Sequence, residues 1–215
     1  GIAASFSSNL APALEEANLL ALRDEFVRYF AVQPVVFRSG RYGVSAVTAA
    51  LLEKHGFTVD TSIAPHTSFT DEGGPDFSGF EFEPFWFGTG RRLLEVPLCR
   101  SVVGWAGQIG RAAYRSLAQP QMPEALLSLL TRSRAAERIT LSPEGNSLDD
   151  MRRLVRWLRA RRCAILPLSF HSSSLAIGHN PYVQSKAELH AFYDRLSGTL
   201  AFLADEVECR FVTLP

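Results

Sequence analysis

Three residues that can move a proton or bind a charge each stand at the end of a short apolar stretch: Arg38, Asp60 and His171. A guanidinium can hold a carboxylate through two parallel hydrogen bonds. A histidine, with an ordinary pKa of about 6.5, can give or take a proton near neutrality, and a neighbouring carboxylate can orient its ring. These residue types predict an acid–base site in which Arg38, Asp60 and His171 are the catalytic residues.

Each candidate also has a structural interpretation. Arg38 can form an ion pair at a sheet edge, and Asp60 can cap the turn after its strand. His171 can bond to its own backbone beside the serines at 172–174. Glu95 lies among apolar neighbours inside its predicted strand, where it either points into a barrel or is a paired structural carboxylate. The sequence leaves these alternatives open.

A glycine-flanked turn, Gly40 to Gly43, directly follows this arginine-bearing stretch. Backbone N–H groups in such a turn can bind an oxyanion, although most glycine turns have no such role. Tyr42 and Gly43 are therefore candidate substrate-binding residues, together with Glu95. His179, in the sequence Gly-His-Asn-Pro-Tyr, either contacts a ligand or simply occupies a turn.

Helices and short strands alternate along the chain, which predicts an α/β fold with a parallel sheet, either open and doubly wound or closed into a barrel. In both, ligands bind at the carboxyl ends of the strands. Strands are predicted over 35–38, 57–60, 93–98, 138–141, 163–170 and 209–214. Helices are predicted over 12–31, from Val44 to Gly56, over 108–118 and 123–132, after the capping pair Ser147 and Asp150, and along an apolar stripe from Leu189 to Leu203.

The segment 64–92 is rich in glycine, proline and phenylalanine and fits neither a helix nor a disordered linker. It is predicted to be an aromatic loop or hairpin inserted in a single domain that spans 1–215. Its cluster from Phe80 to Phe87 can stack sugars or other flat ligands, or it can belong to a satellite core.

The composition of the chain limits the kinds of partner and the cellular compartment that are expected for it. The formal net charge is zero, so no nucleic-acid partner is expected. No apolar run is long enough for a transmembrane helix. Three widely spaced cysteines predict buried free thiols in a reducing, cytoplasmic compartment. Neither a phosphate-binding glycine loop nor a nucleophile elbow is present.

In their order and spacing, three motifs resemble those of the polysaccharide deacetylases with a NodB-homology domain, carbohydrate esterase family four. Phe-Arg followed by Tyr42-Gly43 resembles the arginine motif of that family. Val-Asp60-Thr-Ser resembles its aspartate strand, and Leu-x-x-His171 resembles its final histidine motif. The arginine motif is one residue longer than usual, and no tryptophan follows Asp60.

This resemblance implies a distorted (β/α) barrel, of which the chain would be the C-terminal two thirds without the first strands. It also implies a divalent metal, usually zinc, that polarises an N-acetyl carbonyl. Arg38 would orient the catalytic aspartate, the backbone near Tyr42 would help to hold the oxyanion, and His171, supported by Asp60, would protonate the leaving amine. The paired-aspartate and His-x-x-x-His motifs that bind metal in the family would precede Gly1. Asp149-Asp150 cannot substitute, because it lies in the first turn of a predicted helix after the arginine motif, so no residue is assigned to a metal.

The first hypothesis is therefore a metal-dependent hydrolase that removes acyl groups from an N-acetylated glycan or glycolipid and that is inactive as this chain alone. The second is a non-catalytic carbohydrate-binding or assembly protein on the same barrel, using the aromatic segment. A third possibility is a small amide or an amidated base as the substrate.

Overall fold

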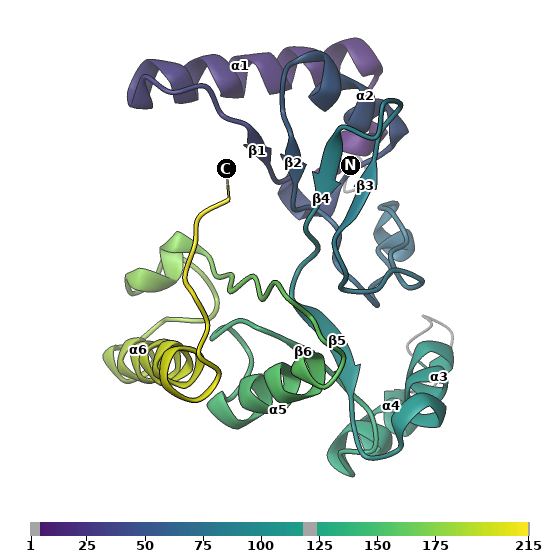
Figure 1. The fold of residues 1–215 in the computed structure, drawn as a ribbon, viewed down its shortest axis with the longest axis vertical. Helices are drawn as coiled ribbons and strands as arrows, with labels where there is room; N and C mark the ends of the chain where they lie inside the picture. Colours follow the sequence, from purple (N-terminus) through teal and green to yellow (C-terminus); the bar gives the residue numbers. More distant parts are fainter. Residues whose placement is uncertain (1–4, 118–123, 215) are drawn as a thin grey trace. The chain divides into compact units, whose positions relative to one another are not determined.

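The computed structural model describes residues 5–117 and 124–214, which form a mixed α/β fold (Figure 1). The chain divides into two compact units. Unit 1 runs up to Pro97 and includes the chain again from Thr213, and unit 2 is Leu98–Val212. Among the described residues, no helix is both long enough and apolar enough to cross a bilayer.

Unit 1 contains a four-stranded sheet in the order β1-β2-β4-β3. The first three of these strands are mutually parallel, whereas β3 runs antiparallel to β4. Short 3-10 turns lie at Ser7–Asn9, Gly40–Tyr42 and Thr70–Glu72. The elements are α1 (Pro12–Phe30), β1 (Val36–Phe37), α2 (Ala46–Lys54), β2 (Val59–Asp60), β3 (Phe85–Phe87) and β4 (Leu93–Glu95).

Local sequence explains both helices of unit 1. Pro12 occupies the first turn of α1, where its missing N–H costs nothing. Helix α2 begins with a capping box, in which the side chains of Ser45 and Thr48 each bond to the backbone N–H of the other. The two helices and the sheet then share one apolar core, formed by Leu19, Ala49, Leu51, Leu52, Phe57 and Leu93.

Unit 2 contains the antiparallel pair of β5 and β6, covered by helices. Figure 1 shows α5 and α6 side by side in this unit, and the two helices are in contact. The capping box of Ser147 and Asp150 starts α5, whose buried face is Met151, Leu154, Val155 and Leu158, as predicted. The elements are β5 (Arg100–Val103), α3 (Gly107–Leu117), α4 (Glu124–Arg132), β6 (Glu137–Thr140), α5 (Leu148–Arg159), the 3-10 turn Ser172–Leu175, α6 (Lys186–Ala201) and the π-turn Phe202–Glu206.

All six predicted helices are present in the structure, within a few residues at the described ends. The ends predicted at 118 and 123 lie outside the described residues. The strands predicted over 35–38, 57–60 and 93–98 are confirmed in shorter form, and the strand predicted over 138–141 is confirmed one residue earlier, as β6. Strand β5 was not predicted, because its sequence Arg-Ser-Val-Val gives only a brief apolar signal.

The strands predicted over 163–170 and 209–214 are wrong, since neither segment pairs as a strand. Pro167 removes a backbone donor from the first segment. Among the described backbone bonds, Ser169 N donates to the carbonyl oxygen of Leu141, the residue directly after β6, and the segment has no bond to β6 itself. The second segment is mostly exposed. Cys163 and Cys209 are therefore half-buried free thiols in irregular chain, and Cys99 alone of the three is buried.

The expectation of an all-parallel sheet also needs correction, because β3–β4 and β5–β6 are antiparallel. Antiparallel neighbours can be joined by a short connection, which residues 88–92 supply between β3 and β4. The chain between β5 and β6 is longer and contains α3 and α4. Within the described residues the sheets have four and two strands and form no closed barrel. The segment 64–92 contains the 3-10 turn Thr70–Glu72 and strand β3, which forms a hairpin with β4.

Candidate functional site

Two acidic residues stand side by side in the sheet of unit 1. The register pairs Asp60 of β2 with Glu95 of β4, and it continues the row through Phe37 of β1 and Phe85 of β3. Residues in one row of a sheet point to the same face, and adjacent strands lie about 4.8 Å apart. Both carboxyl groups therefore lie on the same face at the carboxyl ends of their strands.

Each carboxyl has one oxygen that accepts bonds from fixed donors and one that does not. Oδ1 of Asp60 accepts bonds from Thr61 N (2.8 Å) and Ser62 Oγ (2.5 Å). Oε1 of Glu95 accepts a bond from Ile63 N (2.9 Å). The remaining oxygens, Asp60 Oδ2 and Glu95 Oε2, are buried and accept no bond from a fixed donor. A proton on Glu95 allows the two carboxyls to hydrogen-bond to each other. This bond partly offsets the rise in the pKa of Asp60 that burial causes, and it adds to the rise in the pKa of Glu95.

Burial raises the pKa of both groups, because a charged carboxylate is poorly solvated there. The pKa of Glu95 rises to about 10, first through burial and then through the negative charge of Asp60. Hydrogen bonds from Ser62 and Thr61 partly oppose the rise in the pKa of Asp60. At neutral pH the pair therefore carries a proton on Glu95, and Asp60 is the better-stabilised anion.

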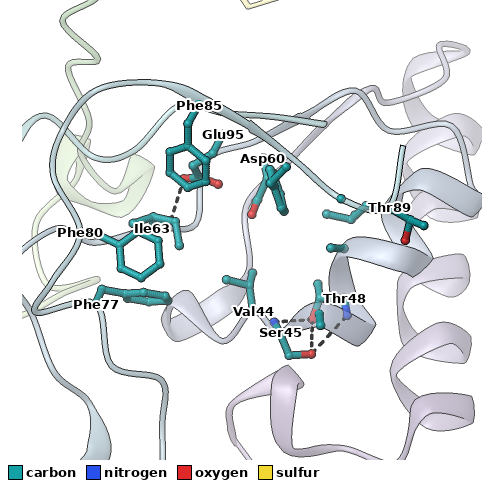
Figure 2. Close-up of a pocket in the computed structure, with 15 residues that line it drawn as sticks. Val44, Ser45, Thr48, Asp60, Ile63, Phe77, Phe80, Phe85, Thr89 and Glu95 are labelled. Carbon is teal, nitrogen blue, oxygen red and sulfur yellow. Dashed lines mark hydrogen bonds between the residues drawn. The ribbon is translucent and has the colours of Figure 1, made fainter. Parts of the chain in front are cut away.

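The two carboxyls line a cavity of about 510 Å³ within unit 1. Figure 2 shows phenylalanine rings gathered on one side of the cavity and the start of α2, with Ser45 and Thr48, on the other. Asp60 and Glu95 are close together between these walls. The aromatic wall consists of Phe77, Phe80, Phe85 and Phe87.

Arg38 lies next to this pair but does not hydrogen-bond to it. Its Nε donates to the carbonyl oxygen (3.1 Å) and the hydroxyl (3.2 Å) of Thr61, the residue after Asp60. Its positive charge slightly opposes the rise in the pKa of Glu95. Arg38 thus holds the chain that leaves Asp60, and a direct role in orienting that carboxylate stays a prediction.

The turn after Arg38 uses its own backbone donors. Tyr42 N donates to Ser39 O (3.1 Å) and Gly43 N to Gly40 O (3.3 Å), so both amides already have partners inside the turn. A Cβ on Gly43 would lie 2.9 Å from Ser7 N, which explains the glycine there. The ring of Tyr42 stacks on Phe69, with centroids 5.7 Å apart. The oxyanion role of this turn stays a prediction.

His171 belongs to unit 2 and has a different acidic partner from the one considered in the sequence. Nδ1 of its ring lies 2.8 Å from Oε2 of Glu144, and its backbone N–H donates to Oε1 of the same residue (2.9 Å). Support of His171 by Asp60, which lies in unit 1, stays a prediction. His179 is exposed in the turn after Gly178, and its ligand role also stays a prediction.

The sequence interpretation missed Glu144, although one signal pointed to it. Asp60 is the last residue of β2, and Glu144 lies four residues after the end of β6, in a turn that contains proline and glycine. An acidic residue in such a turn is usually solvated, so its position gave no reason to pair it with a distant histidine. Structural context alone reveals the pair.

A catalytic zinc needs about three protein ligands. Among the residues that the structure describes, no three or more His, Cys, Asp and Glu side chains come together as such a ligand set. Asp60 and Glu95 supply two carboxyl groups only. The residues present do not make up the expected zinc site, so no chemical step below passes through a metal.

Comparisons of the chain with family models, with curated proteins and with solved structures gave no match. The comparisons therefore identify no family. The carboxyl pair, the aromatic cavity and the acid–histidine pair are interpreted from their own geometry.

Proposed function

We propose that this chain is a hydrolase-type protein that recognises N-acylated sugars and cleaves their amide C–N bond. The observation that carries the proposal is the pair of neighbouring carboxyls, Asp60 and Glu95, on the wall of an aromatic cavity. Apolar walls with a few convergent polar groups are typical of small-molecule sites. A sugar suits such a site, because its C–H faces can stack on aromatic rings while its polar groups bond to carboxyls.

The surroundings of the two carboxyls favour different proton-transfer roles. Asp60, held as the anion by hydrogen bonds, would accept a proton from an attacking water. Glu95, whose pKa is about 10, would keep its proton and donate it to the amide carbonyl oxygen. The water oxygen then bonds to the carbonyl carbon, and Asp60 passes the proton that it took from the water to the amine nitrogen as the C–N bond breaks. The carboxylic acid product returns a proton to Glu95, so both carboxyls regain their starting states.

Further parts of the proposal rest on the resemblance described in the sequence analysis. They are a barrel of the NodB type, orientation of Asp60 by Arg38 and protonation of the leaving amine by His171. A zinc ion bound by residues outside this chain is a further part, as are substrate contacts from Tyr42, Gly43 and His179. No step above depends on them.

The first test is binding, measured by calorimetric titration of the chain with N-acetylglucosamine oligomers. Phe80→Ala is expected to weaken binding about 2- to 12-fold, because it removes a stacking ring worth about 0.5–1.5 kcal/mol. Trp86→Ala is the matched control, since Trp86 lies in the same hairpin but does not line the cavity. If the unaltered chain does not bind these oligomers, the proposed substrate class is wrong.

The second test is release of acetate from the same oligomers. Asp60→Asn is expected to abolish any release, because the anion that accepts the proton from water is lost. Glu83→Gln, an exposed change in unit 1, is the control. Release that survives Asp60→Asn would contradict the role given to Asp60.

A second candidate function, non-catalytic carbohydrate binding, is favoured by one observation. Asp60 and Glu95 are each only 1% exposed, so little of either carboxyl meets solvent in this structure. A protein that only binds a sugar needs the aromatic rings that line the cavity, and it does not need carboxyls that reach the ligand. Binding that depends on Phe80, without acetate release from any N-acetylated oligomer, would select this function.

A further inference from the structure

We propose that Glu144 is a positioning residue that fixes the ring proton of His171 on Nδ1, so that Nε2 is the atom that exchanges a proton with a substrate. The inference rests on the proposed function for the reaction that His171 would serve. The position of the ring proton can be measured without any substrate. All of the residues involved lie in unit 2.

The first step concerns the bonds that Glu144 accepts. Its side chain is 6% exposed, and its oxygens accept bonds from His171 N, His171 Nδ1 and the hydroxyl of Ser174. An ionised carboxylate only accepts hydrogen bonds. The ring nitrogen that faces it, Nδ1, must therefore be the one that carries the proton in the neutral ring.

The second step concerns the turn that carries Glu144, which is held from several directions. Ser142 Oγ accepts a bond from Glu144 N (3.2 Å), and the amide of Asn146 donates to Glu144 O (2.9 Å). Arg195 of α6 donates to Pro143 O (2.8 Å). A turn fixed between β6 and α5 in this way places the carboxylate with little freedom.

The third step concerns the histidine ring, which is open to solvent where Glu144 is not. The side chain of His171 is 65% exposed. One face of the ring stacks on Tyr182, with centroids 6.1 Å apart and an angle of 17° between the planes. Asn180 links Tyr182 to the serine that bonds to Glu144, since its amide donates to Ser174 Oγ (2.7 Å) and its side-chain carbonyl accepts from Tyr182 N (2.8 Å).

A buried acid that orients a histidine, with the second ring nitrogen left accessible, is the arrangement used for general acid–base catalysis. Structural histidines in turns do not need this arrangement, because a single backbone bond suffices for them. The geometry therefore assigns Nε2 of His171 as the atom that transfers a proton. It assigns Glu144 as the group that holds the ring proton on Nδ1 and so leaves Nε2 free of it.

The test is two-bond ¹H–¹⁵N correlation NMR on the chain with ¹⁵N-labelled histidine, at a pH well above the ordinary histidine pKa of about 6.5. His171→Gln assigns the signal. We expect a protonated Nδ1 and an unprotonated Nε2. The opposite assignment in the unaltered chain would overturn the proposal without any variant.

Glu144→Gln sharpens the test. The backbone N–H of His171 can only donate, so it keeps the amide oxygen of the new glutamine, and the NH₂ group then faces Nδ1. That nitrogen must become an acceptor, which moves the ring proton to Nε2. Glu208→Gln, an exposed change in unit 2, should leave the signal unaltered. An unmoved proton in a folded Glu144→Gln chain would also overturn the proposal.

If Glu144→Gln does not fold, Ser174→Ala takes its place, because it removes a bond to Glu144 and leaves the ring contact. It should retain the proton on Nδ1, and a shift to Nε2 would contradict the role of Glu144. If the NMR result is as expected but the chain releases no acetate, the proposed function is refuted and this inference is not.

Discussion

At the scale of single residues, the raised pKa of Glu95 makes the stability of unit 1 depend on pH. The ordinary pKa is 4.5 and the folded value about 10, so between these limits the folded state holds a proton that the unfolded chain has released. The free energy of unfolding therefore falls as pH rises through this window, by at most about 1.4 kcal/mol per pH unit for one proton. The raised pKa of Asp60 acts in the same direction.

Glu95→Gln should remove most of the fall in the free energy of unfolding that accompanies rising pH. The glutamine oxygen can still accept from Ile63 N, and its NH₂ group can donate to Oδ2 of Asp60. Relative to the unaltered chain, the variant should gain stability between about pH 5 and about pH 9. Urea titrations followed at the NMR signals of β2 and β4 measure this difference. Glu83→Gln should behave like the unaltered chain, and a Glu95→Gln variant with the same pH slope would contradict the prediction.

At the scale of elements, Thr48 joins α2 to α1. It is buried, its hydroxyl donates to Oε1 of the buried Glu15 (2.5 Å), and it also accepts from Ser45 N (3.0 Å) in the capping box. Thr48→Val keeps the shape of the side chain but removes both bonds and leaves the buried acid without this donor. We expect a loss of about 2–3 kcal/mol in the free energy of unfolding.

Thr48→Ser is the matched control, because it keeps the hydroxyl and should cost only about 1 kcal/mol for the lost methyl group. Val47→Ala, an exposed change at the neighbouring position, should cost less still. Denaturant unfolding measures the free energy of unfolding of the three variants and so ranks their losses of stability. Equal losses for Thr48→Val and Thr48→Ser would mean that the hydroxyl bonds contribute nothing.

Elements with a local signal could be predicted from the sequence, and those that depend on distant neighbours could not. The capping box of α5 and its buried face needed only residues a few positions apart. The apolar run over 163–170 resembled a buried strand, but a strand needs a partner, and Pro167 lacks a donor for one. For strand β5 the sequence signal was weak because the strand begins with polar residues, yet the segment forms a strand because it pairs with β6.

The same distinction holds for the candidate site. Asp60 and His171 stood out because each ends an apolar stretch, and the sequence also singled out Glu95 as a possible paired carboxylate. Its partner became visible only in the register of β2 against β4. Glu144 pairs with a histidine 27 residues away through a turn, and no local pattern encodes that contact.

At the scale of the whole molecule, the division into two units predicts that each has its own cooperative core. Leu52 of α2 and Leu154 of α5 are both fully buried, one in each unit. Replacing a buried leucine by alanine costs about 2–5 kcal/mol. If the units open separately, Leu52→Ala should speed amide exchange in the strands of unit 1 at least about 30-fold and leave α5 unchanged, and Leu154→Ala should do the reverse.

Hydrogen exchange with mass spectrometry reads both units in one experiment. Leu22→Ala and Leu129→Ala are the matched controls, because these leucines are 66% and 67% exposed and lie in units 1 and 2, respectively. Neither control should change exchange appreciably. If each core variant instead speeds exchange equally in both units, the chain unfolds as one cooperative body. The proton-transfer sites of Asp60 and His171 would then share a single stability, whereas separate opening would let each be disabled without the other.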